Sequence, residues 1–327
     1  MVSILVTGGA GYIGSHTLRA LESGGYQPVC FDNLSTGFKS FAGNAPLIEG
    51  DLRNPPDLDL AFTSYPIDAV IHFASHALVE ESNRNPYKYY HDNILNCLNL
   101  LEAMKRHRVR LIVFSSSCAT YGVPAQVPIR ETAPLAPVNP YGMTKMVIER
   151  ILGDYERAHG LRYVALRYFN AAGAAPDGKI GERHNPETHL IPRVLDVALG
   201  ICNSAQVYGN DYPTPDGTCI RDYIHVVDLA VAHRAALDFL FARDTSDIFN
   251  LGTGSGCSVL DIIRQAIQTT GKDIPLRFEP RRPGDPPQLV ADPTKAFDQL
   301  GWHPQHSSID EILQSAWNWH KTVVSSQ

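Results

Sequence analysis

Tyr141 and Lys145 have side chains and a spacing that suit proton transfer. They stand four residues apart in the segment Tyr-Gly-Met-Thr-Lys, so a helix would bring the phenol and the ammonium to one face. A tyrosine with its ordinary pKa of about 10 is a poor base at neutral pH, but a nearby cation favours the phenolate. The pair therefore predicts a general base, and a solvated helix face is the alternative.

A serine run, Ser115–Ser117, ends an apolar stretch upstream of that pair. At the carboxyl end of a central strand, Ser117 would hydrogen-bond a substrate hydroxyl and share in proton transfer. Ser115 and Ser116 are expected only to cap the end of the strand. No G-x-S-x-G elbow surrounds Ser117, which excludes a serine hydrolase of that type.

A glycine-rich segment directly follows the first apolar run, Ser3–Thr7. Its glycines Gly8, Gly11 and Gly14 have the spacing G-x-x-G-x-x-G, a variant of the dinucleotide-binding fingerprint. Glycines let the chain turn tightly and let a pyrophosphate approach the backbone, where the amides at a helix N-terminus stabilise its charge. A strand, this loop and a helix in that order predict a dinucleotide site.

Two aspartates follow the next apolar runs. Asp32 lies about 20 residues beyond the glycine loop, where an acid accepts hydrogen bonds from the adenosine ribose. A carboxylate there repels a 2′-phosphate, so NAD is predicted rather than NADP; a turn formed by Asp32 and Asn33 is the alternative. Asp51, which precedes Leu52, is expected either to reach the adenine edge or to cap a turn.

The elements that must position these groups alternate along the first half of the chain. Apolar runs predict strands at Ser3–Thr7, Pro28–Asp32, Leu47–Gly50, Ala69–Phe73, Leu111–Ser115 and Tyr163–Arg167. Amphipathic spacing predicts helices at Gly14–Ser23, Asn93–His107 and Tyr141–His159. Continuous apolar strands alternating with helices predict an α/β fold, a doubly wound parallel sheet of the Rossmann type with ligands at the carboxyl ends of its strands.

The alternation breaks after Asn170. Residues typical of loops fill Gly173–Pro186, Asp211–Gly217 and Pro280–Pro287, whereas the α/β pattern returns at Asp228–Phe241 and Ile248–Leu251. We therefore expect a cofactor-binding domain of residues 1–169 plus about 222–251. A smaller, discontinuous substrate-binding domain is expected to comprise about 170–221 plus 252–327.

Composition narrows the function classes. The 327 residues carry a net charge of −6 with no basic block, which speaks against a nucleic-acid partner. No apolar run approaches the roughly 20 residues that span a bilayer, and no signal peptide is recognisable, so neither a membrane partner nor secretion is expected. The six cysteines form no C-x-x-C pair and are expected to be reduced and mostly buried, as in a cytoplasmic protein.

Several segments together resemble the UDP-glucose 4-epimerases, a family within the extended short-chain dehydrogenases/reductases. The segments are Thr7–His16, Asp32-Asn33, Phe114–Ser117, Tyr121-Gly122, Tyr141–Lys145, Arg167–Asn170 and Gly209–His225. The resemblance implies an enzyme with tightly bound NAD that interconverts UDP-glucose and UDP-galactose through a transient 4-keto sugar. It also implies a homodimer in which the helices Asn93–His107 and Tyr141–His159 pair with their mates; the alternative is that these helices only cover the sheet.

The resemblance also implies a role for each matching residue. Tyr141 would take the proton of the sugar 4-hydroxyl, Lys145 would hold the nicotinamide ribose, and Ser117 would lie beside the 4-hydroxyl. The implied cofactor-binding residues are Gly8, Gly11, Tyr12, Ile13, Gly14, Asp32, Asn33, Asp51, Leu52, Phe73, Ala74, Ser117, Tyr141, Lys145 and Phe169. The implied substrate-binding residues are Ser117, Tyr141, Asn170, Tyr208, Arg221, Arg282 and Asp285.

Two alternative functions share the fold, and a third alternative does not require catalysis. A nucleotide-sugar 4,6-dehydratase needs an Asp-Glu pair after Ser117, where this chain has Cys118-Ala119. An epimerase of UDP-pentoses stays open. A non-catalytic NAD sensor would have no need of Tyr141 and Lys145.

The chain departs from the family pattern at a few positions. Ala77 stands where some relatives have a cofactor-contacting lysine, and His189 stands where a substrate-binding asparagine is usual. Leu289 matches a position that borders the sugar, although a core leucine is the alternative. No metal is expected, because His184 and His189 show no third ligand at a suitable spacing.

Overall fold

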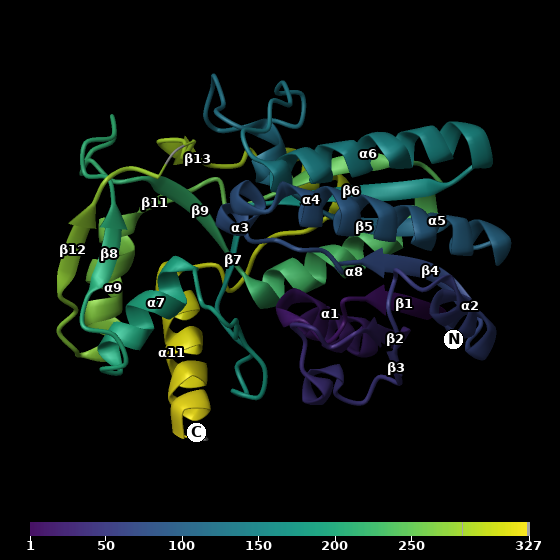
Figure 1. Cartoon of the computed structure of the whole chain (residues 1–327), viewed down its shortest axis with the longest axis horizontal. Helices are drawn as coiled ribbons and strands as arrows, with labels where there is room; N and C mark the ends of the chain where they lie inside the picture. The colour runs from purple at the N-terminus through teal and green to yellow at the C-terminus, as the bar shows by residue number, and fades with distance from the viewer. Residues whose placement is uncertain (283, 326–327) are drawn as a thin grey trace.

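Seven parallel strands form the central sheet of the computed structural model, which describes residues 1–282 and 284–325 (Figure 1). The strands lie in the order β10-β6-β5-β4-β1-β2-β3. Their bounds are β1 Ser3–Thr7, β2 Gln27–Asp32, β3 Leu47–Glu49, β4 Ile67–His72, β5 Leu111–Ser117, β6 Arg162–Tyr168 and β10 Asp247–Leu251. The strand order reverses between β1 and β4, so the carboxyl edge at this point is the expected ligand crevice. The predicted Rossmann-type sheet is confirmed.

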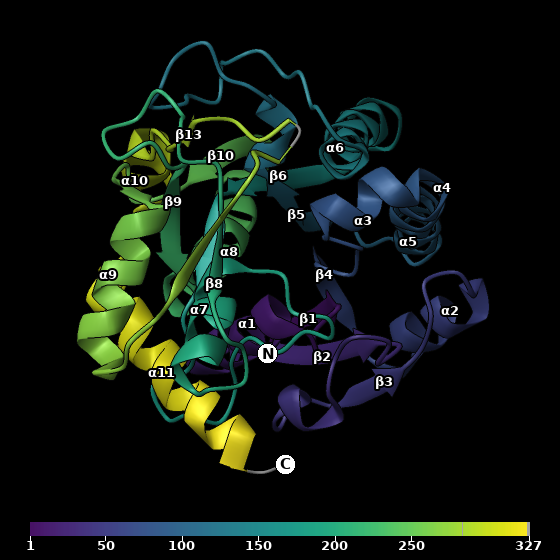
Figure 2. The same ribbon diagram turned by 60° about the vertical axis from the view of Figure 1, so that its left-hand side comes forward.

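Helices cover both faces of this sheet, as Figure 2 shows. One layer contains α1 (Tyr12–Ser23) and α8 (Val226–Arg243); the other contains α2 (Pro55–Ser64), α5 (Asn96–Arg106) and α6 (Pro140–His159). Successive strand residues point to opposite faces, so Val6 packs in the core with α1 and α8 while Leu5 packs in the core with α2, α5 and α6. Burial on both faces explains why the strands are continuous apolar runs.

A second group of elements lies beside the carboxyl edge of the sheet, on the left in Figure 1. Its strands are β7 (Asn170–Ala172), β8 (Ala205–Tyr208), β9 (Ile220–His225), β11 (Gly256–Ser258), β12 (Leu276–Glu279) and β13 (Gln288–Leu289). Its helices are α7 (Leu190–Ala198), α9 (Val259–Thr270) and α11 (Ile309–Ser325), and they share a core of their own. The helix α10 (Thr294–Leu300) packs instead against β10 and α8.

The predicted helix Asn93–His107 differs from the structure at its start. Helical backbone begins earlier, with α3 (Val79–Arg84), α4 (Pro86–Tyr89) and a π-helical turn η2 (Tyr90–Leu95) before α5. The short 3₁₀ turns η1 (Lys39–Ala42) and η3 (Cys118–Tyr121) complete the described elements. Within the described residues no helix has the length and apolar character to span a bilayer. All six cysteines are free thiols, four of them buried.

Candidate active site

The glycine loop is shaped for an anion at the N-terminus of α1. Gly8 has a φ of +73°, and a Cβ there would lie 2.7 Å from the backbone nitrogen of Ala74. A Cβ on Gly14 would lie 2.2 Å from the carbonyl oxygen of Gly8. No side chain caps the N-terminus of α1 and its first turn has no acidic residue, so its amides are available to an anion. The loop therefore fits the pyrophosphate of a dinucleotide.

Asp32 lies at the carboxyl end of β2 and holds the loop in place. One carboxylate oxygen accepts a hydrogen bond from the amide of Ala10 at 2.9 Å, and the other accepts one from the amide of Leu34 at 2.8 Å. Burial raises the pKa of Asp32, and these two amides oppose the rise. The aspartate therefore contributes to the turn that we considered as an alternative, and it does so at the edge where a ribose is expected.

Asp51 and Leu52 follow β3 at the same edge. The Asn33 amide donates to Asp51 at 3.0 Å, and the hydrogen bonds of Arg53 hold the pKa of Asp51 below its usual value. The Leu52 side chain packs in the core with α2 and α5, and its carbonyl accepts a hydrogen bond from Asn99 at 2.9 Å.

Tyr141 and Lys145 share one buried face of α6, as their spacing predicts. Asn139 begins this helix by accepting a hydrogen bond from the amide of Gly142 at 2.8 Å. The Lys145 ammonium lies 5.7 Å from the centre of the Tyr141 ring. It donates to the carbonyl of Ser115 at 2.7 Å, which fixes it against the end of β5. A second bond, to the Ser75 hydroxyl at 2.8 Å, ties it to the loop after β4.

Burial shifts the pKa of both side chains toward their neutral forms. It raises the pKa of Tyr141 well above its usual value, with a smaller opposite effect from the Ser117 hydroxyl. It lowers the pKa of Lys145 to about 7, although Cys97 and Glu149 oppose this. The surroundings of Tyr141 therefore favour its neutral phenol.

A buried polar network behind Ser117 joins α6 to the sheet, and no sequence motif predicted it. Glu149 of α6 accepts hydrogen bonds from the Ser116 hydroxyl at 2.5 Å and from Arg167 of β6 at 2.9 Å. Arg167 also donates to the hydroxyl of Tyr121 at 2.9 Å. The prediction that Ser115 and Ser116 only cap the strand is wrong, because both lie within β5 and bond to neighbouring elements; Ser115 bonds to the hydroxyl of Tyr168.

Besides Ser117 and Tyr141, the five other predicted substrate residues come from β7, β8, β9 and the segment before β13. The guanidinium of Arg282 lies 3.9 Å from the centre of the Tyr208 ring, and Arg221 forms an ion pair with Asp285. Asn170, at the start of β7, pairs with β9. Four of these five residues thus form two contacting pairs.

An apolar cluster connects these residues to the region of Ser117. Leu289 pairs in register with Arg221 and packs with Cys118, Tyr121 and Phe169. Leu289 is therefore both a buried leucine and a neighbour of the residue that follows Ser117, so the two interpretations of this position are compatible. Phe73 packs separately, against His233 of α8 at 4.6 Å between ring centres.

Comparison with known proteins supports the assignment suggested by the motifs. The chain is 50% identical over 320 residues to the UDP-glucose 4-epimerase of Halalkalibacterium halodurans, an alignment that spans 98% of this chain and 96% of that one. It is also 50% identical over 321 residues to the UDP-glucose 4-epimerase of Lacticaseibacillus casei, with 98% and 97% covered.

Solved structures agree with these relatives. The UDP-glucose 4-epimerase of Brucella ovis in complex with NAD superposes with a TM-score of 0.94 at 49% identity, covering 97% of this chain and 98% of that one. The enzyme of Bifidobacterium longum in complex with NAD⁺ and UDP gives a TM-score of 0.94 at 40% identity, with both chains fully covered. Residues 4–252 match the model of the NAD dependent epimerase/dehydratase family. The predicted resemblance and the predicted cofactor are thereby confirmed: this chain belongs to the NAD dependent epimerase/dehydratase family.

Proposed function

We propose that this chain interconverts UDP-galactose and UDP-glucose through a transient 4-keto sugar. The observation that carries the proposal is the buried Tyr141–Lys145 pair beside the end of β5, next to a loop that fits a pyrophosphate. The names of relatives that are 50% identical over nearly the whole chain support the same reaction. Bound NAD supplies the acceptor and then the donor of a hydride, together with a positive charge that favours the phenolate.

The carboxyl edge of the sheet holds the cofactor in this proposal. The backbone at Gly8, Gly11, Tyr12, Ile13 and Gly14 receives the pyrophosphate, and Asp32 with Asn33 receives the adenosine ribose. Asp51 and Leu52 border the adenine. Lys145 holds the nicotinamide ribose, with Phe73, Ala74 and Phe169 beside the cofactor. The charge of Asp32 favours NAD over NADP.

Tyr141 acts as the base and then as the acid. The hydrogen on C4 is not acidic, so deprotonation of the 4-hydroxyl must accompany its loss as hydride. Tyr141 takes the hydroxyl proton as the carbonyl forms, while Ser117 hydrogen-bonds the same oxygen. When the hydride returns to the opposite face, Tyr141 gives the proton back and the configuration at C4 is inverted. The side chains of Tyr141 and Ser117 are both buried, which limits the access of water to this exchange.

The sugar must turn over while the nucleotide stays bound. Arg221 and Arg282 grip the diphosphate, which suits the planar guanidinium. Tyr208 and Asp285 position these arginines and border the uridine, and Asn170 contacts the phosphates. In the corresponding division into domains, residues 1–169 and about 222–251 bind the cofactor, and the remaining residues bind the nucleotide sugar.

Two further properties belong to this proposal. The chain forms a homodimer through α5 and α6, and it works in the cytoplasm, where free thiols such as its six cysteines persist. No nucleic acid takes part.

Incubation of the purified protein with UDP-galactose and separation of the products tests the reaction. We expect UDP-glucose with no net accumulation of reduced nicotinamide. Stoichiometric reduced cofactor would show a dehydrogenase, and a 4-keto-6-deoxy product would show a dehydratase. A parallel incubation with UDP-arabinopyranose decides whether pentoses are also substrates; a rate above that on UDP-galactose would make the chain a pentose epimerase.

A further inference from the structure

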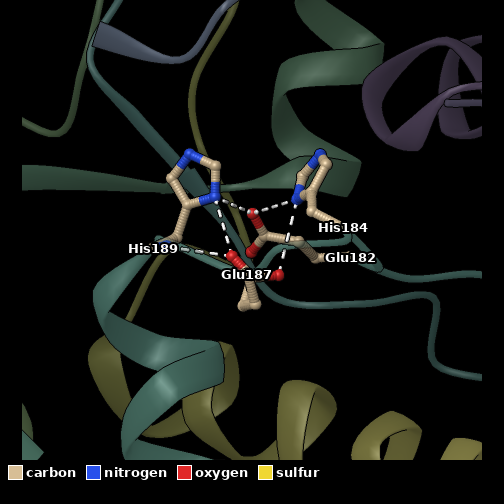
Figure 3. A group of neighbouring side chains, drawn as sticks. All are labelled: Glu182, His184, Glu187 and His189. Carbon is tan, nitrogen blue, oxygen red and sulfur yellow. Dashed lines mark hydrogen bonds and ion pairs between the residues drawn. The ribbon is translucent and has the colours of Figure 1, made fainter. Parts of the chain in front are cut away.

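Two glutamates and two histidines converge in the segment before α7. Figure 3 shows Glu182, His184, Glu187 and His189 with their polar atoms directed toward one another. The spacing is Glu-x-His-x-x-Glu-x-His, and one possible ligand atom from each residue lies within 4.8 Å of all the others. From the sequence we considered only the two histidines, because the two glutamates become neighbours of both only in the folded loop.

The distances suit a tetrahedral metal ion. Zinc binds imidazole nitrogen and carboxylate oxygen at about 2.0–2.2 Å, so neighbouring ligand atoms of a zinc tetrahedron lie about 3.3–3.5 Å apart. The Nδ1 atom of His184 lies 3.4 Å from Glu182 Oε1 and 3.5 Å from Glu187 Oε2. The Nδ1 atom of His189 lies 2.8 Å and 3.1 Å from oxygens of the same two carboxylates. These two distances are hydrogen-bond lengths, so the His189 ring must move away from both carboxylates to reach the edge length of the tetrahedron.

The surroundings of the His184 Nδ1 atom agree with these distances. This atom is buried and, within the described residues, makes no hydrogen bond of normal geometry, although it forms ion-pair contacts with both carboxylates. Its two carboxylate neighbours are farther away than the usual N–H···O distance of about 2.7–3.2 Å. Its distances from the two carboxylates equal the edge length of a zinc tetrahedron, which fits the role of a ligand.

Charge and ligand type select the class of cation. Two carboxylates and two neutral imidazoles carry a charge of −2, which one divalent ion neutralises. Calcium and magnesium prefer sites made of oxygen alone, whereas imidazole with carboxylate suits zinc and its neighbours in the first transition series. Burial opposes protonation of the two histidines, but the carboxylates raise the pKa of His184 to about 9 and that of His189 to about 10. Ion pairs between the two histidines and the two glutamates are therefore the competing arrangement.

We propose that Glu182, His184, Glu187 and His189 form a structural site for zinc or a similar divalent transition-metal ion. The site lies where three parts of the fold meet. His189 is the residue directly before α7, and the carbonyl of Glu182 accepts a hydrogen bond from Trp319 of α11 at 2.8 Å. A bound ion cross-links the segment Glu182–His189 and fixes it between α7 and α11.

Titration of the full-length protein with zinc, after dialysis against metal-free buffer, tests this site. We expect one equivalent per chain. His184→Gln and Glu187→Gln should each weaken zinc binding by at least about 100-fold, because each removes one of four ligands. His306→Gln is the matched control, since its Nδ1 lies 3.6 Å from Glu311 Oε1 outside the cluster, and it should retain the affinity within about twofold. His189 stays unchanged because the resemblance implies a substrate contact there.

Two further measurements distinguish zinc at this cluster from zinc bound by the cysteines. Cobalt in place of zinc should give the visible bands of a tetrahedral ion without the near-ultraviolet band of a cobalt–thiolate bond. Circular dichroism and NAD content show whether each variant is folded. The proposal fails if the wild type binds no zinc, if two folded variants keep its affinity, or if the thiolate band appears and persists in His184→Gln. If the wild type binds no zinc, the histidines and glutamates of the cluster form ion pairs only.

Discussion

At Tyr141 burial and the proposed chemistry act in opposite directions, because the fold favours the neutral phenol that the reaction must ionise. Removing only the hydroxyl with Tyr141→Phe should reduce kcat by about 10²–10⁴-fold, the usual contribution of a general base. NAD content should not change. Tyr155→Phe, in the same helix but bonded to Glu102 at 2.8 Å, is the control and should keep normal turnover. Steady-state rates of both variants test whether Tyr141 is the general base. Near-normal turnover of Tyr141→Phe would show that another residue takes the proton.

The second prediction concerns which sugars the site accepts, and it rests on Leu289. Its side chain packs with Cys118 and Phe169 near the proposed sugar position, so a substrate with an N-acetyl group should clash with it. We expect the wild type to prefer UDP-galactose over UDP-N-acetylgalactosamine. Leu289→Ser should narrow the difference in kcat/KM by about tenfold, mainly by raising the value for the acetylated sugar. Equal kcat/KM values in the wild type, or an unchanged ratio in the variant, would show that Leu289 does not limit the sugar.

Residues near in sequence were predictable, and residues joined only by the fold were not. Tyr141 and Lys145 share a helix, so their spacing alone places them on one face. The Glu149–Arg167 pair depends on how a helix meets a strand, which no local pattern contains. The Glu182–His189 cluster is an exception, because its four residues lie within eight positions and only the closure of the loop turns them toward one another. Arg221 and Asp285 were found only through the resemblance.

Helix packing on one face of the sheet predicts how stability depends on pH. α1 and α8 bury His16 and His233, and burial lowers their pKa values to about 3 and about 4. Because these values lie below the unfolded value of about 6.5, the unfolded chain binds more protons on acidification. Stability should therefore fall as the pH decreases from about 6.5 toward 4.

Replacement of one histidine tests this dependence. His233→Phe should reduce the loss of unfolding free energy between pH 6.5 and pH 4.5 by about 2 kcal/mol, since its pKa of about 4 in the folded chain lies well below the unfolded value. His303 is exposed, so His303→Phe is the control and should leave the loss of unfolding free energy between these pH values unchanged. Urea denaturation at several pH values measures both, and parallel curves for His233→Phe and the wild type would contradict the assignment.

Most strands and long helices agreed with the sequence pattern to within about three residues because both faces of the sheet are buried. The elements that the pattern missed have weaker periodicity. Most side chains of β12 are exposed, so it has no apolar run, and the π-helical turn Tyr90–Leu95 merges with α5 in sequence. Tertiary contacts determine such elements more than local propensity does.

For the whole molecule, the proposed dimer predicts a concentration-dependent mass. Tyr90 and Leu95, in the turn that leads into α5, are 41% and 39% exposed, so they offer apolar surface beside the proposed contact. Leu95→Arg should raise the dimer dissociation constant by at least about tenfold. Leu60→Arg on α2, where the leucine is 56% exposed, is the control. Sedimentation velocity distinguishes them; a monomeric wild type would remove the dimer from the proposal.

The order of the sheet also has a consequence for synthesis on the ribosome. β6 pairs with β10, whose first residue follows the end of β6 by about 80 residues, so at 5–20 residues per second the partner arrives about 4–16 s later. Leu166 and its register partner Phe249 are both fully buried in the finished chain. Until β10 has been synthesised, β6 gives the nascent protein an apolar, unpaired strand edge, which is a template for association with other chains. Translation that stalls between these two strands should therefore yield aggregation-prone fragments, whereas chains released after Leu251 have all the strands of the sheet.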